Sequence, residues 1–142
     1  MNDASKAADR LWGPARLKQL EKQNKLIQDE VKLLKQKKKE AQANLIKDRS
    51  DLSKAAAAAG VSFNIDEKGN ITNYTEKMDA LYAELKSREN EADGFAKAGK
   101  SKEKQDEYIE KYVTSLQDKI NELKEAMSQY EEARELLEDI DD

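Results

Sequence analysis

Apolar residues recur at alternating intervals of three and four positions along the first sixty residues, which is the heptad pattern of a helix that packs along one stripe. The pattern predicts a first arm over residues 14–59, starting at Gly13-Pro14 because proline is tolerated in the first helical turn. Residues 3–12 would form a short N-terminal helix or the end of a cut helix. The two core positions hold Leu17, Asn24, Val31, Lys38, Leu45, Leu52 and Ala59, and Leu20, Ile27, Leu34, Ala41, Asp48 and Ala55.

Three polar residues, Asn24, Lys38 and Asp48, interrupt this seam. Polar residues at core positions lower the stability of a coiled coil and can set its register or its number of strands. Further apolar residues widen the stripe, as expected for a helix with more than one neighbour. They are Leu26, Leu33 and Ile46. The core residues are too mixed to choose between a monomeric hairpin, a dimer and a trimer.

A different pattern follows the first arm. Gly60 stands where a helix commonly ends in a left-handed residue. Apolar and polar residues then alternate with the period of a half-buried strand, and a polar stretch around Gly69 supplies a turn. We therefore expect a turn module over residues 60–72 that contains a short β-hairpin-like turn at 61–72. The alternating apolar residues are Val61, Phe63 and Ile65.

Helical spacing returns in a second arm at residues 73–93, where Asn73 and Glu76 have the spacing of a capping box. The helical spacing of apolar residues is interrupted again near 94–100, and it resumes in a third segment at 101–140. Ser101 can cap the start of this third segment. A kink at the break would make a two-armed hairpin, and a reversal would make a three-helix arrangement; both remain open. The third segment carries the most regular seam, with Ile109, Leu116, Leu123, Tyr130 and Leu137 every seven residues.

Composition agrees with an extended helical protein. Of the 142 residues 37% are hydrophobic and 39% charged, with one proline and five glycines. Such chains are more often coiled coils than globules, and regular apolar spacing argues against disorder. The predicted fold is all-α: a single elongated antiparallel coiled-coil helical hairpin, expected to be a fragment of a longer chain.

The charges are distributed unevenly along the chain. Residues 1–60 carry 14 basic and 8 acidic residues, a balance of +6, whereas residues 61–142 carry 12 and 22, a balance of −10. Arms of opposite sign would attract each other if they lay side by side. Alternatively, each charged face is simply solvated.

Candidate chemistry is sparse. The chain has no cysteine and no histidine, which removes thiolate chemistry and the commonest general base and metal ligand. Residues 63–75 align with a calcium-binding EF-hand loop, but positions 1, 3, 5 and 12 hold Asn64, Asp66, Lys68 and Thr75. Because a lysine and a threonine replace carboxylates, we expect a plain turn and no metal site.

Two charged clusters remain. The basic cluster Lys32, Lys35, Lys37, Lys38 and Lys39 could contact phosphates, but no aromatic residue is interleaved, so we expect a solvated or ion-paired face and no specific nucleic acid. The acidic end from Glu131 to Asp142 lacks the pocket that carboxylate catalysis needs. We predict no enzyme activity and no catalytic or cofactor-binding residues. With no apolar run long enough to cross a bilayer and no visible signal peptide, we expect a soluble protein.

The order of certain segments resembles a coiled-coil segment of the tape measure proteins of long-tailed bacteriophages and prophages. The resemblance runs from about Ala8 to Leu137, and its most specific part is the turn segment GVSFNIDEKGNITNY. It implies a structural role in setting tail length inside the tail tube, with tube and chaperone proteins as partners. It also implies a location in the virion, or in the host bacterial cytoplasm during assembly. Independently of the resemblance, we expect self-association through the heptad seams. The alternative function is a stand-alone soluble coiled-coil module for protein–protein interaction, which docks a partner protein through its apolar seam.

Overall fold

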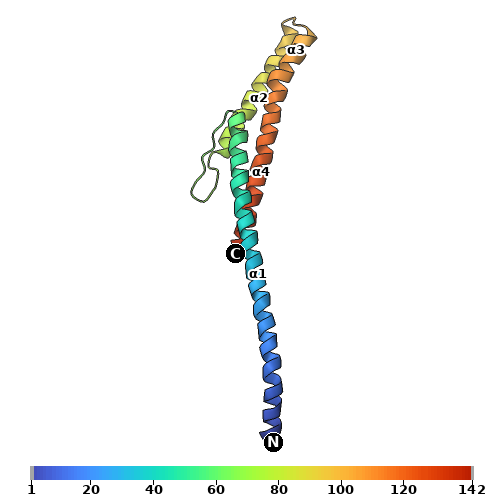
Figure 1. Ribbon diagram of the computed structural model, residues 1–142. Coiled ribbons are helices and arrows are strands. Elements are labelled where there is room, and N and C mark those ends of the chain that lie inside the picture. The colour runs from blue at the N-terminus through green and yellow to red at the C-terminus, as the bar shows by residue number, and fades with distance from the viewer. Residues whose placement is uncertain (1, 142) are drawn as a thin grey trace.

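The computed structural model describes the backbone of residues 2–141 and the side chains of residues 13–141. It is an all-α molecule whose elements are α1 (Asn2–Ala58), α2 (Tyr74–Lys97), α3 (Lys102–Tyr108), a π-helical turn η1 (Ile109–Thr114) and α4 (Ser115–Asp141). The backbone stays helical at both junctions of η1, so that α3, η1 and α4 form one rod. Figure 1 shows this rod running back past α2 and then along the upper part of α1.

Helix α1 is continuous through Gly13 and Pro14, so the predicted helix start at these residues, and a separate helix over 3–12, are wrong. Proline inside a helix loses one hydrogen bond and strains the preceding turn. Alanine, leucine, arginine and lysine on both sides favour helix and carry it through this point. With 57 residues, α1 is about 85 Å long at ~1.5 Å per residue.

The end of helix α1 is followed by a left-handed residue, Gly60, as the sequence predicted. Gly60 has a φ of 77°, which a residue with a Cβ rarely adopts. Its N–H donates to the carbonyl of Ala57 at 3.0 Å, and the N–H of Val61 donates to that of Ala56 at 2.9 Å. These two bonds form a Schellman motif, which satisfies carbonyls that the last turn leaves unpaired.

The predicted β-hairpin at 61–72 is wrong, because no β-strand forms in the part of the chain that the structure describes. One isolated bridge joins Ile65 and Ile71. Asn73 explains why pairing stops: its side chain accepts from the N–H of Asn64 at 2.8 Å and donates to the carbonyl of Ser62 at 3.1 Å. These side-chain bonds take the place of a longer ladder. They also leave Asn73 without the predicted side-chain cap on α2.

The break near 94–100 is a reversal, so the chain has a three-helix arrangement instead of two arms. Gly99 turns the chain with a φ of 74°, and the Ser101 hydroxyl accepts from the N–H of Lys104 at 3.3 Å, which confirms the predicted cap. The rod then packs first against α2 and afterwards against α1 (Figure 1). The first arm therefore has α4, not the second arm, as its main neighbour.

The hydrophobic core lies where α1, α2 and α4 meet. Leucine and isoleucine side chains of α4 fill the space between the end of α1 and the face of α2. Val61, Phe63 and Ile71 of the loop pack against the core from outside. The buried residues of this cluster are Leu52, Ala56, Met78, Leu81, Leu85, Leu116, Ile120, Leu123 and Tyr130.

Candidate functional site

Residues 17–34 of α1 expose the apolar seam that the heptad pattern predicted. Large side chains that a coiled coil would bury are open to solvent between Leu17 and Leu34. Complete burial of one such side chain lowers the free energy by about 1.5–3 kcal/mol. A contiguous apolar stripe on a charged helix commonly marks an interaction surface. We call Leu17, Leu20, Asn24, Ile27, Val31 and Leu34 the open seam.

The open seam continues directly into the interface between α1 and α4. Leu34 is 54% exposed, whereas Ala41, at the next equivalent heptad position, is 3% exposed. The change occurs beside Asp141, the last described residue of α4, whose carboxylate pairs with Lys38. The same face of one helix is therefore covered within the chain beyond Lys38 and uncovered before it.

The three polar residues of the seam have different surroundings. Asn24 lies in the open seam, and Asp48 is half-buried in a groove with Gln129 and Glu132 of α4. The ammonium of Lys38 pairs with the carboxylate of Asp141 at 2.7 Å. Lys38 therefore marks the boundary between the covered and the open parts of the seam.

A second, narrower apolar stripe lies away from the open seam. Leu26 and Leu33 are exposed and lie one heptad apart on the helix. At 100° per residue, this stripe faces a different direction from Ile27 and Leu34. Because the two stripes carry similar side chains on different faces, they can be tested against each other.

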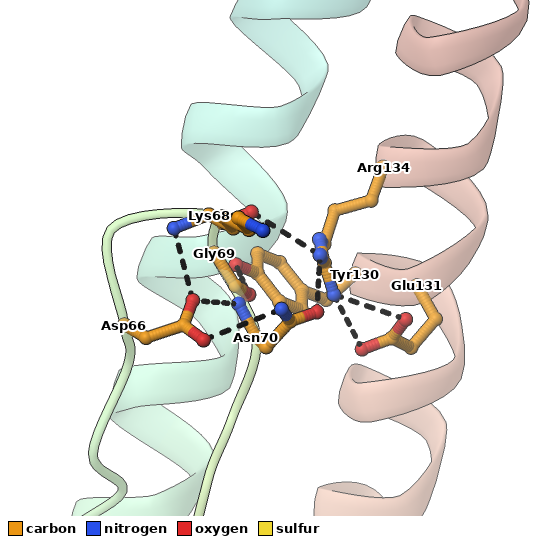
Figure 2. A network of polar contacts seen from close by, with 7 residues as sticks. All are labelled: Asp66, Lys68, Gly69, Asn70, Tyr130, Glu131 and Arg134. Carbon is orange, nitrogen blue, oxygen red and sulfur yellow. Dashed lines mark hydrogen bonds and ion pairs between the residues drawn. The ribbon is translucent and has the colours of Figure 1, made fainter.

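The loop between α1 and α2 is fastened to α4 by a polar network (Figure 2). The hydroxyl of Tyr130, a buried core residue, donates to the carbonyl of Gly69 at 2.6 Å. The guanidinium of Arg134 donates to the side chain of Asn70 at 2.6 Å and to the carbonyl of Lys68 at 3.2 Å. The heptad pattern placed Tyr130 in the core but did not predict the network. The available signal was a tyrosine in an otherwise aliphatic seam, because a buried hydroxyl needs a hydrogen-bond partner.

The same network shows what Asp66 does in the segment that aligns with an EF-hand loop. Its carboxylate accepts from the N–H groups of Lys68 and Asn70 at 2.9 and 2.8 Å. This is an Asx-type turn, in which the carboxylate substitutes for backbone pairing. Among the residues that the structure describes, no group of three or more histidine, cysteine or acidic residues could hold a metal ion.

The two charged clusters meet at one point. Besides the pair between Lys38 and Asp141, the described ion pairs lie within single helices. The other lysines of the basic cluster are exposed on α1. Between the described parts of the oppositely charged arms, contact is therefore largely apolar, and most of the charge faces solvent.

We expect Tyr130→Phe to lower the free energy of unfolding by about 1 kcal/mol, because it removes a hydrogen bond without removing the ring. Urea unfolding measures this loss, and faster amide exchange at Gly69 locates it in the loop. Tyr82→Phe is the matched control, since Tyr82 is 41% exposed and should change stability by less than ~0.5 kcal/mol. Equal losses in the two variants would contradict a fastening role for Tyr130.

We also expect the Asx turn to loosen in acid. Hydrogen bonding from the Asn70 N–H, with a smaller contribution from Lys68, holds the pKa of Asp66 below its ordinary value of 3.8. A carboxylate with a lowered pKa stabilises the folded loop above the ordinary value, and that contribution is lost as pH falls through the folded pKa. Amide chemical shifts of Lys68 and Asn70 should titrate with a midpoint below 3.8 and should lose this step in Asp66→Asn. A midpoint at or above the ordinary value would contradict the turn.

Comparison with known proteins gives no relative for this chain: no protein-family model, no curated protein and no solved structure matches it. Among the described residues, no helix is both long and apolar enough to span a membrane. The open seam, together with the fastened loop that helps to hold α1 against α4, is therefore the feature on which a functional proposal must rest.

Proposed function

We propose that this chain is a non-catalytic structural element that works by self-association through the open seam of α1. The observation that carries the proposal is the run of exposed heptad residues from Leu17 to Leu34, continuous with a seam that is buried elsewhere in the same helix. An extended helix gains most of its stability from packing one face. Residues 17–34 of α1 present such a face, and its large apolar side chains are exposed in the described chain.

The test is the mass of the wild-type chain over a wide range of concentration, by sedimentation equilibrium. We expect the average mass to rise from that of a monomer to a defined multiple at micromolar concentrations. A monomer mass up to millimolar concentrations would overturn the proposal. Binding of a different protein by the monomer, with no self-association, would instead favour the stand-alone interaction module.

For the biological setting we propose a coiled-coil segment of a phage tail tape measure protein. Support comes from the sequence resemblance, centred on residues 60–74, and from an extended first helix of about 85 Å. In this role the segment would lie in the tail tube lumen, with tube and chaperone proteins as partners. An in-frame deletion of the segment in the parent phage should shorten the tail, as measured by electron microscopy. Tails of unchanged length would count against the role.

A further inference from the structure

We infer that the open seam is occupied by a second copy of the same chain, parallel and in register, in a two-stranded coiled coil over residues 14–38. This inference rests on the proposed self-association and specifies its geometry. In the complex, each open-seam residue faces its own counterpart. At Lys38 the two copies of α1 diverge, and beyond that point each packs against its own α4.

The open seam is continuous with the α1–α4 interface. Helix α4 covers the seam as far as Asp141, and its last ion pair is with Lys38. The uncovered part before this point is about 36 Å long at ~1.5 Å per residue. A partner helix of equal length and identical apolar spacing is supplied by the same part of a second copy.

Asn24 decides the orientation. In a parallel, in-register pair, Asn24 faces Asn24 of the second copy, and one amide can donate to the other. In an antiparallel pair that overlaps over the whole open seam, Asn24 would face Ile27 instead. Its amide would then be buried against an apolar side chain, which is unfavourable without a hydrogen-bond partner. The parallel pair is the one that satisfies this residue.

The charges that flank the seam agree with the same orientation. Charged residues commonly flank the core of a parallel coiled coil. The residue just before the core position that Asn24 and Val31 occupy lies next to the residue five positions later in the partner helix. Glu30 and Lys35 have this relation, so the parallel pair places opposite charges together twice by symmetry. Gln23 and Gln28 have it too and are neutral. The pairs at these flanking positions are therefore attractive or neutral.

Asn24 favours a defined pair, because a single asparagine at a core position specifies the register and the oligomeric state of a coiled coil. The apolar core residues alone are mixed. Val31 with Leu20 and Leu34 follows the pattern of dimers, whereas Leu17 and Ile27 do not. Lys38 then ends the two-stranded part, because its ammonium is held by Asp141 of its own chain. A lysine at a core position would be unfavourable in a longer two-stranded coil.

Single cysteine substitutions test the geometry, because the chain has no cysteine of its own. In the parallel pair, residue 20 faces residue 20, whereas in the antiparallel pair it faces residue 31. We would oxidise Leu20→Cys alone, Val31→Cys alone and an equimolar mixture of the two, with one chain isotope-labelled so that mass spectrometry identifies each dimer. Sedimentation of the reduced variants checks that they still associate.

We expect each variant alone to give a disulfide-linked dimer in high yield. Disulfides that form only between the two different chains would establish the antiparallel pair and overturn the inference. Weak cross-linking of chains that still associate, or a trimer mass, would also overturn it, yet would leave the proposed self-association standing. A wild-type chain that stays monomeric would overturn both.

Discussion

Leu34→Lys is expected to raise the dissociation constant for self-association at least about a hundredfold, which corresponds to ~2.7 kcal/mol. The substitution removes an apolar side chain from the open seam and would bury an ammonium without a partner, which is costly. The monomer should fold as before, because residue 34 is exposed in it. Sedimentation velocity over a concentration series measures the effect, and circular dichroism checks that the helix content is unchanged.

The neighbouring Leu33→Lys is the matched control. Leu33 is 50% exposed and Leu34 is 54% exposed, and both lie in the same uncovered stretch of α1. They differ in the face of the helix on which they lie, so Leu33→Lys should leave the dissociation constant within a fewfold of that of the wild type. If both variants weaken association equally, or if Leu33→Lys alone does, the open seam is not the interface.

Leu123→Ala is expected to lower the free energy of unfolding by about 2–5 kcal/mol, the usual range for a leucine truncated inside a packed core. Leu123 is 0% exposed and lies in the cluster that joins α4 to both other helices. Truncation removes contacts and leaves a cavity that the surrounding helices fill only in part. Against a total stability of about 5–15 kcal/mol for a typical domain, such a loss is large.

The matched control for the core is Leu136→Ala, which makes the same change on the same helix. Leu136 is 51% exposed, so this variant should change the free energy of unfolding by less than ~0.5 kcal/mol. Urea unfolding below the concentration at which the chain associates should shift the midpoint for Leu123→Ala with little change in slope. Similar midpoints for the two variants would show that α4 does not organise the core.

Several elements of the fold could be predicted from the sequence because their causes are local. Apolar spacing indicated helix over nearly all of the three helical segments. Gly60 and Ser101 indicated where one helix ends and another begins, and their backbone geometry and hydrogen bonds confirm both. Each of these features depends on the conformational preference of one residue or on bonds within a single turn of helix.

The wrong predictions concern residues whose local preference is outweighed by their surroundings. Pro14 favours a helix start, yet the residues on both sides continue the helix through it. Alternating apolar residues after Gly60 favour a strand, yet they pack against the helices, and Asn73 takes up hydrogen bonds that a ladder would need. The capping function predicted for Asn73 is lost for the same reason.

The candidate site, like the fold, could be predicted from the sequence only in part. The heptad pattern identified every residue of the open seam, because the spacing of apolar side chains on a helix follows from helical geometry alone. It assigned Ala41 and Leu34 to the same face and could not tell that one is covered and the other is open. Likewise, Tyr130 could be assigned to the core but not to the carbonyl of Gly69, sixty-one residues away in the chain.

The sequence by itself determined the all-α class, the heptad seams, the end of α1 before Gly60 and the cap of α3 at Ser101, since these depend on contacts between residues a few positions apart. Only the tertiary structure decided that the chain reverses after α2, and that α4 and not the second arm covers the part of α1 that follows Lys38. The physical reason is that apolar stripes are similar and can pack against one another in several arrangements. The choice among them depends on the lengths of the helices and on the loop that Tyr130 and Arg134 hold in place.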